Sequence, residues 1–351
     1  MKRVRALIWH GLPAWCNVYM IAQILFVALF FEGGPFYFAL LTALIPSGPA
    51  IYYIFTLRRN GPKGLKSSDI DTWMDASPDA LPPDQLRELT NATEGPATRW
   101  FALTVLLAPV LAWIAYSFVF GKTGPLSQDR ALLVFEISSA LWAILLFLHC
   151  LFQRGAQQAV IFFLGAGLYA FLLETGGIEM GFFSEASFHV FFPFSHTPLA
   201  VVSGWCTVFY PAFFLGEFLA HRWRATQVSL FPIIVGLVAL ASDLHLDPVA
   251  TALQFWTWHA DLPARFLDVP VVNFTSWFWA VFAFGAGFLT IIRIGTRMQW
   301  KRSTSTLVFI VSIPAIQGMA GFCNFLCIGL IEGFDGPSWK LLLLSIASYV
   351  P

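Results

Sequence analysis

The sequence predicts an all-α, polytopic membrane protein, a bundle of transmembrane helices with about nine spans. Only 11% of the residues are charged and 58% are hydrophobic, whereas about a quarter of the residues of a soluble domain are charged. The 37 Phe and 14 Trp suit a chain surrounded by acyl chains, with Trp at the membrane interfaces. Apolar stretches recur along the chain at the length of about 20 residues that a membrane-spanning helix needs.

Each apolar stretch defines one expected span, to within a few residues. A tenth stretch, 338–350, is short, so between eight and ten spans are expected. The first stretch follows a basic N-terminus and ends at Glu32 without a small-x-small cleavage site, which favours an uncleaved first span over a signal peptide. The nine full-length stretches are 12–31, 36–56, 99–120, 131–152, 156–174, 197–220, 226–243, 271–295 and 305–330.

The distribution of Lys and Arg predicts the orientation of these spans. With the N-terminus in the cytoplasm, sixteen of the 20 basic residues fall on the inner side and four on the outer side, as the positive-inside rule requires. We therefore expect a multi-pass protein of the cell (inner) membrane. Residues 1–98 would form two N-terminal spans with an acidic cytoplasmic loop at 57–98, interpreted as a solvated connector. Residues 99–351 would form the membrane-embedded core.

Acidic residues gather near the predicted outer ends of the core spans. Ionisable residues within a membrane are costly and are functional candidates by default. Glu136 lies five residues into its predicted helix, Glu174 ends the fifth span, and Asp243 and Asp247 end the seventh. All four therefore favour one side of the bilayer.

The most specific local pattern is Ser242-Asp-Leu-His-Leu-Asp247-Pro248. On a helix, Asp243 and Asp247 share one face because they are four residues apart. A neighbouring carboxylate, removal from water and the dipole of a helix C-terminus all favour a proton on one of them. Pro248 disfavours helix in the residue before it, so the chain is expected to turn there. The pair suits a general acid; a helix end whose acids lie in water is the alternative.

The segment after this pair is rich in aromatic residues. It contains Trp256 and Trp258, then Asn273 and Trp277. Aromatic faces stabilise a desolvated cation by about 2 kcal/mol, and an acid beside such a wall is what the protonation of an alkene requires. Each Trp taken singly also fits an aromatic belt at the membrane interface.

Within this stretch the sequence resembles an integral-membrane carotenoid biosynthesis family that includes the CruF-type and bisanhydrobacterioruberin hydratases. The resemblance rests on Asp243-Leu-His-Leu-Asp247-Pro248, on Trp256-Thr-Trp258, and on Val269-Pro270-Val-Val-Asn273 followed by Trp277. Glu174 with the glycine-rich, aromatic residues that follow it is similar to an upstream family feature. The similarity covers about residues 130–300.

The resemblance implies hydration of the terminal isopropylidene double bond of an acyclic carotenoid to a tertiary alcohol. Asp243 or Asp247 would donate the proton, and Glu174 would position water or take back its proton. Substrate-binding residues would be Trp256, Trp258, Asn273 and Trp277, with Glu136 as a further candidate. No cofactor, metal or nucleic acid is expected. The expected partners are a polyene from the bilayer, lipid and other carotenoid enzymes.

Other functions remain open at the level of the sequence. A cyclase begins with the same protonation and differs in how the cation is quenched. A prenyltransferase could use paired aspartates to hold Mg²⁺ against a diphosphate, although such enzymes also need basic residues near the acids. A metal enzyme is a further alternative, because the predicted outer side contains His189, His196, His245 and His259, although no two of them form a His-x-x-x-His pair. A non-catalytic transporter or assembly protein would be expected to show internal repeats with broken helices.

Overall fold

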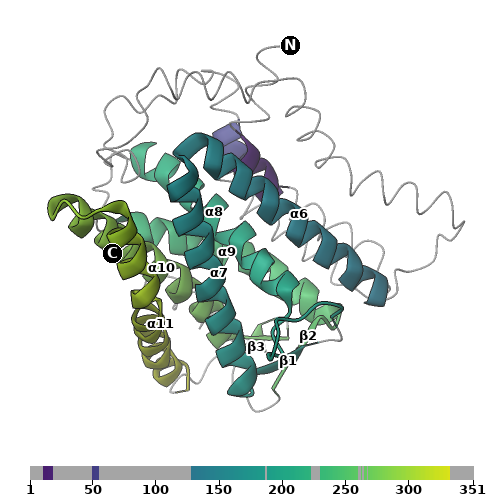
Figure 1. The fold of residues 1–351 in the computed structure, drawn as a ribbon. Helices are drawn as coiled ribbons and strands as arrows, with labels where there is room; N and C mark the ends of the chain where they lie inside the picture. Colours follow the sequence, from purple (N-terminus) through teal and green to yellow (C-terminus); the bar gives the residue numbers. More distant parts are fainter. Residues whose placement is uncertain are drawn as a thin grey trace, which may run out of the picture.

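A computed structural model describes residues 11–18, 50–54, 128–185, 188–222, 230–259, 262, 265, 266 and 268–332. Short helical stretches cover 12–18 and 50–54. The predicted spans 12–31, 36–56 and 99–120, the loop 57–98 and the segment 338–350 lie wholly or largely outside the described residues. The elements in chain order (Figure 1) are α6 (Gln128–Arg154), α7 (Ala156–Glu179), β1 (Phe183–Glu185), α8 (Leu199–Arg222), α9 (Leu230–Ala252), β2 (Trp256–Trp258), β3 (Arg265–Phe266), β4 (Val269–Pro270), α10 (Val271–Arg297) and α11 (Arg302–Glu332).

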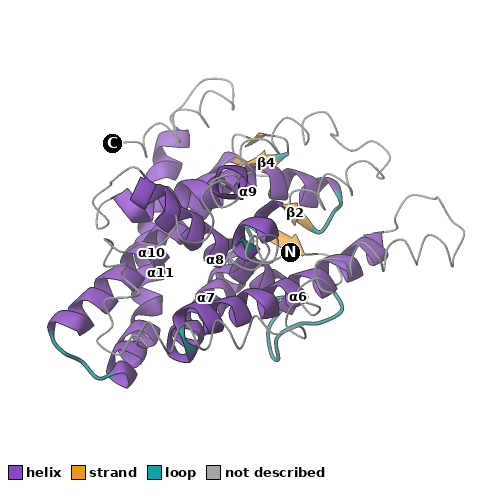
Figure 2. Cartoon of the chain, turned by 90° about the horizontal axis from the view of Figure 1, so that it is seen from above, coloured by secondary structure: helices purple, strands orange, loops and turns teal. Residues whose placement is uncertain are grey.

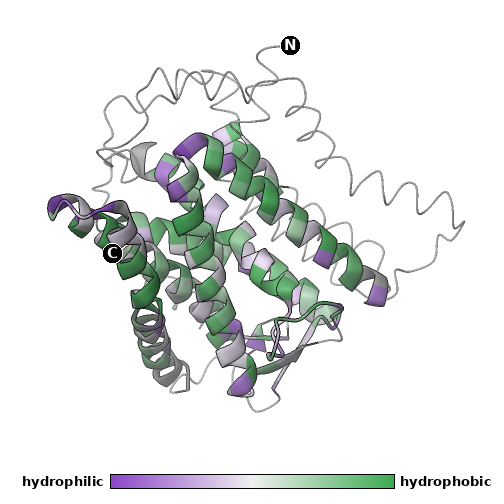
Figure 3. Ribbon diagram, in the orientation of Figure 1, coloured by the Kyte–Doolittle hydropathy of each residue, from purple (hydrophilic) through white to green (hydrophobic). Residues whose placement is uncertain are grey.

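All six long helices are long and apolar enough to cross a membrane. They match the six spans predicted between residues 131 and 330 to within a few residues, apart from the ends of α7 and α9. Most residues of the long helices are hydrophobic, and many of the hydrophilic ones lie toward the helix ends (Figure 3). The described part of the chain is therefore a helical membrane protein. The total of nine spans and the cytoplasmic N-terminus stay predictions.

Two helices continue past the residues predicted to end them. α7 runs beyond Glu174 to Glu179, and α9 runs through Pro248 to Ala252; the turn expected at Pro248 is wrong. A proline inside a helix removes one hydrogen bond and costs about 3 kcal/mol. Here the turn after the proline is held by burial of Val249, Ala250 and Leu253. A backbone bond from the Leu253 N–H to the Val249 carbonyl, 2.9 Å long, closes it.

α8 lies in the middle of the bundle, with α6, α7 and α9 packed around it (Figure 2). It is the most buried of the six spans, and α11 is the least buried. Phenylalanine rings fill the space between helices: Phe162 of α7 meets Phe213 of α8 edge to face at 5.0 Å, and Phe288 of α10 meets Phe309 of α11 in the same way. Because lipid is as apolar as these rings, packing rather than the hydrophobic effect holds the helices together.

A polar cluster ties α6 to α8 at the end of the bundle where α7 begins. An Nη2 donor of Arg154 lies 2.5 Å from a carboxylate oxygen of Glu217, and Nδ1 of His149 lies 2.9 Å from the hydroxyl of Tyr210. Because these polar side chains pair with one another, they are tolerated within two apolar helices, and no catalytic role is needed to explain them.

The contact between α7 and α11 depends on a glycine. A Cβ atom at Gly165 would lie 2.4 Å from the Cε1 atom of Phe309, whereas at Gly167 it would meet nothing within 4 Å. Phe309 is fully buried against Phe284 and Phe288. These contacts restrict how far the Phe309 ring can move.

We expect Gly165→Val to lower the free energy of unfolding by about 1–3 kcal/mol through overpacking. The matched variant Gly167→Val places the same side chain on the same helix in open space and should change it by less than about 0.5 kcal/mol. Melting temperatures of the two variants in one detergent compare them. Equal melting temperatures would contradict the close approach of α7 and α11.

Candidate functional site

A cavity of about 400 Å³ lies at the end of the bundle where α7 and α9 finish and α10 begins. Residues of all six helices and of the strands β1 and β2 line it. Most of the wall is apolar. Its carboxyl, amide and hydroxyl groups belong to Glu174, Asp247, Asn273, Ser276 and Asn324, and it also contains the indoles of Trp205, Trp256, Trp258 and Trp277. The site is thus an apolar pocket with a few polar groups, as small-molecule sites generally are.

The two aspartates of α9 are buried together. Asp243 is 0% and Asp247 2% exposed, so they do not form a solvated helix end. Asp247 lines the cavity, whereas Asp243 lies behind it, one helical turn away, with its carboxyl close enough to interact with that of Asp247. The amide of Asn273 donates to both carboxyls, at 3.2 Å to Oδ2 of Asp243 and at short distance to Oδ2 of Asp247.

Local sequence explains how Asn273 reaches these acids. β3 and β4 pair antiparallel around Asp268, whose φ of 62° makes the tight reversal. Pro270 is the N-cap residue of α10, and a proline has no N–H to leave unsatisfied there. Asn273 therefore lies in the first turn of α10. The partial positive charge of that helix end favours negative charge on the carboxyls beside it.

Glu174 lies on another wall of the cavity and is 9% exposed. The indole Nε1 of Trp205 in α8 donates a hydrogen bond to Glu174. The ring of Trp205 stacks on Trp277 with centroids 4.1 Å apart and planes 27° apart, and Trp277 in turn contacts the Asp247 carboxyl. A stacked pair of indoles therefore connects the aspartate pair to the glutamate.

Trp256 and Trp258 belong to strand β2, which pairs antiparallel with β1. Alternate residues of a strand face the same side, so both indoles are buried in the cavity wall while Thr257 is exposed. Nε1 of Trp258 donates to the Thr251 hydroxyl at 3.0 Å. Nε1 of Trp256 is buried and has no hydrogen-bond partner among the described residues. The Trp-x-Trp spacing thus places two rings on one wall.

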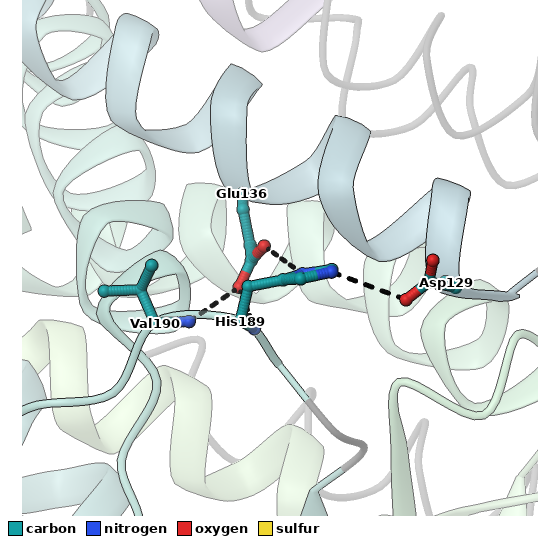
Figure 4. Close-up of polar contacts among 4 residues, drawn as sticks. All are labelled: Asp129, Glu136, His189 and Val190. Atoms are coloured by element: carbon teal, nitrogen blue, oxygen red, sulfur yellow. Dashed lines mark hydrogen bonds and ion pairs between the residues drawn. The ribbon is translucent and has the colours of Figure 1, made fainter.

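Glu136 has a different set of partners, which lie in α6 and in the segment before α8 (Figure 4). Its carboxylate accepts the backbone N–H of His189 at 2.7 Å and that of Val190 at 3.3 Å, and it lies 2.7 Å from Nδ1 of the His189 ring. Asp129 lies 3.4 Å from the other ring nitrogen. Glu136 does not line the cavity, although Phe135 does. Its contacts anchor the segment before α8 to α6.

Two groups in the wall were not expected from the sequence. The first is Trp205, which no local pattern marks because its partner Glu174 is on another helix. The second is Asn324 of α11, whose amide donates to the Ser276 hydroxyl at 2.6 Å and accepts from the Thr275 hydroxyl at 2.6 Å. A single Asn within an apolar span is the sequence feature that could have drawn attention to it, since polar residues there usually bond across helices.

Comparison with known protein families decides the affiliation of the chain. The family model described as "carotenoid biosynthesis protein" matches residues 134–333, more than half of the chain. The chain belongs to the carotenoid biosynthesis protein family. No curated protein and no solved structure gives a significant match.

Family membership confirms the resemblance drawn from the aspartate and tryptophan motifs, and it assigns the membrane bundle to carotenoid biosynthesis. The matched region contains every side chain of the cavity named above. Among the residues that the structure describes, no group of three His, Cys, Asp or Glu side chains lies close enough together to hold a metal ion.

We expect Glu136→Ala to loosen the segment 188–198 because two backbone N–H groups and the His189 ring lose their acceptor. The local opening free energy should fall by about 1–3 kcal/mol, measured as faster amide hydrogen exchange. The control Asp129→Ala removes a carboxylate that is 78% exposed and 3.4 Å from the same ring, so it should cost less than about 1 kcal/mol. Equal exchange in the two variants would contradict an anchoring role for Glu136.

Proposed function

We propose that this protein hydrates the terminal isopropylidene double bond of an acyclic carotenoid and so forms a tertiary alcohol. The observation that carries the proposal is a buried pair of carboxyls that presents one member, Asp247, to an apolar cavity walled by indoles. Membership of the carotenoid biosynthesis family supplies the substrate class. An apolar polyene reaching this cavity from the bilayer would meet an acid and no bulk water.

The aspartate pair supports a proton donor. Two carboxyls in contact and away from water do not both carry a charge, so the pair holds at least one proton. Asp247 lines the cavity, so we assign it as the general acid that would touch the substrate. Asp243 is a positioning residue that acts through Asp247, and Asn273 fixes both carboxyls by hydrogen bonds to their Oδ2 atoms.

Proton transfer from Asp247 to the less substituted alkene carbon forms a C–H bond and leaves a tertiary carbocation. The ring faces of Trp277 and Trp205 and the nearby Trp256 and Trp258 offer cation–π stabilisation of about 2 kcal/mol for a desolvated cation. The Asp247 carboxylate that remains adds a counter-charge. Both effects are stronger in the transition state than in the neutral ground state, which is the condition for faster chemistry.

Glu174 completes the reaction as the general base. The N–H of Trp205 holds its carboxylate at the cavity wall. As the oxygen of water forms the C–O bond, the released proton passes to Glu174. Return of this proton from Glu174 to the aspartate pair then restores both groups for the next turnover. The net change is the addition of one water, and no oxidant or reductant is consumed.

The first test is expression of the full chain in cells that accumulate lycopene, with pigments separated and weighed by mass spectrometry. A hydratase gives a product heavier than lycopene by one water. A product of unchanged mass with altered absorption would identify a cyclase, and a product enlarged by an isoprenoid unit would identify a prenyltransferase. Either outcome would reject hydration.

The second test assigns the acid and the base. Asp247→Asn should reduce product formation at least about 100-fold, the usual scale for the loss of a general acid, and Glu174→Gln should act in the same direction. Asp243→Asn should have a smaller effect, on the order of tenfold, because Asp243 does not line the cavity.

Matched controls for these variants lie nearby on the chain. Asp268→Asn and Glu179→Gln change exposed acids outside the cavity wall and should stay within about twofold of the wild type. Rates are compared at equal protein abundance. Full activity in both Asp247→Asn and Asp243→Asn would show that the aspartate pair is not the acid.

A further inference from the structure

The cavity has a mouth, and its position follows from the exposure of the lining residues. The exposed ones are Met180 and Phe182, at the end of α7 and just beyond it, and Gly321 and Phe325 of α11. Met180 and Phe325 are each 67% exposed, whereas Glu174 and Asp247 deeper in the cavity are almost completely buried. The opening therefore lies between the C-terminal end of α7 and the last turns of α11, two helices packed side by side (Figure 1).

The residues around the mouth are apolar and favour contact with lipid over contact with water. Gly321 and Phe325 lie within the span Ser303–Cys327, and this span is the least buried of the six. None of the four mouth residues carries a charge, and the neighbouring Phe322 of α11 is also exposed. An opening rimmed by apolar side chains on a lipid-facing helix admits an apolar molecule from the bilayer.

The volume of the cavity limits how much of that molecule it holds. An acyclic carotenoid is a rod about as long as the ~30 Å hydrocarbon core of the bilayer is thick. A cavity of about 400 Å³ has room for the end group of such a rod and a few of its double bonds. The remainder must leave through the opening through which the end group came in.

We propose that the α7–α11 mouth is a lateral portal through which one end of a polyene passes from the bilayer to Asp247, while the rest of the chain lies along the lipid-facing side of α11. The proposal rests on the proposed function for the class of substrate. It adds the route by which the substrate enters and the position of the part of the polyene that does not react. It also implies that the two ends of a symmetrical polyene react in separate binding events.

Gly321 keeps this portal open. A Cβ atom at Gly321 meets nothing within 4 Å, and the residue lines the cavity. A large side chain there would project into the mouth without displacing the backbone. Gly318, three residues earlier on the same helix, is equally open but does not line the cavity, so it provides a matched control.

The test compares Gly321→Phe with Gly318→Phe in the full chain, purified into lipid nanodiscs. Lycopene has no chirality, so visible circular dichroism arises only when the protein holds it in an asymmetric environment. We expect Gly321→Phe to reduce this signal and the rate of product formation at least about tenfold, and Gly318→Phe to stay within about twofold of the wild type. Lycopene binding by Gly321→Phe at the wild-type level would overturn the portal, as would absence of the signal in the wild type.

A double variant separates a blocked mouth from a misfolded one. Gly321 and Phe325 are four residues apart and share a helix face, so Gly321→Phe/Phe325→Ala restores space at the mouth and should recover most of the binding signal. Failure of this recovery at a wild-type melting temperature would also overturn the portal. Because binding is read separately from chemistry, lycopene that binds but gains no water rejects the hydratase and leaves the portal intact.

Discussion

The hydrogen bonds from Asn273 to Asp243 and Asp247 are the constraint on which the rest of this site depends. Two carboxyl groups within a membrane bundle are costly, and they are tolerated when every member of the network finds a partner. Here one amide, that of Asn273, donates to an oxygen of each carboxyl, although Oδ1 of Asp243 is buried without a hydrogen-bond partner among the described residues. To bring them together, α9 must continue through a proline, and the β3–β4 reversal must start α10 within reach. The geometry of the acid is therefore inseparable from the packing of α9 on α10.

The tryptophans of the cavity use both the apolar ring and the polar N–H of the indole. At a membrane interface an indole anchors a helix because one end is apolar and the other is polar. In the cavity, Trp205 uses both properties within the protein: its apolar ring stacks on Trp277, and its N–H donates a hydrogen bond to Glu174. The stacked pair gives an electron-rich surface and also orients the glutamate. One side chain thereby links the wall that would face a cation to the group that would handle water.

The bilayer is part of the site. The cavity is apolar, its mouth is rimmed by Met180, Phe182, Gly321 and Phe325, and α11, which forms one side of the mouth, is the least buried of the six spans. A substrate that is dissolved in the membrane reaches such a pocket without crossing water. Water would be the scarce reactant in this environment, and the proposed hydration therefore needs a group such as Glu174 at the cavity wall to bind it.

The sequence alone determined the class of fold and the local half of the site. Hydropathy and length located the six helices between residues 131 and 330 because the bilayer sets both quantities. The four-residue spacing of Asp243 and Asp247 and the alternation of Trp256 and Trp258 identified side chains that share a face, because helix and strand periodicities are local properties. The tertiary structure decided what those faces meet. In the folded chain, Trp205 donates to Glu174 and Asn324 donates to Ser276. Glu136 contacts His189 and does not line the cavity, and α9 continues past Pro248. Each of these outcomes depends on packing between helices distant in the chain, and such packing can outweigh a local preference of a few kcal/mol without leaving any periodic trace in the sequence.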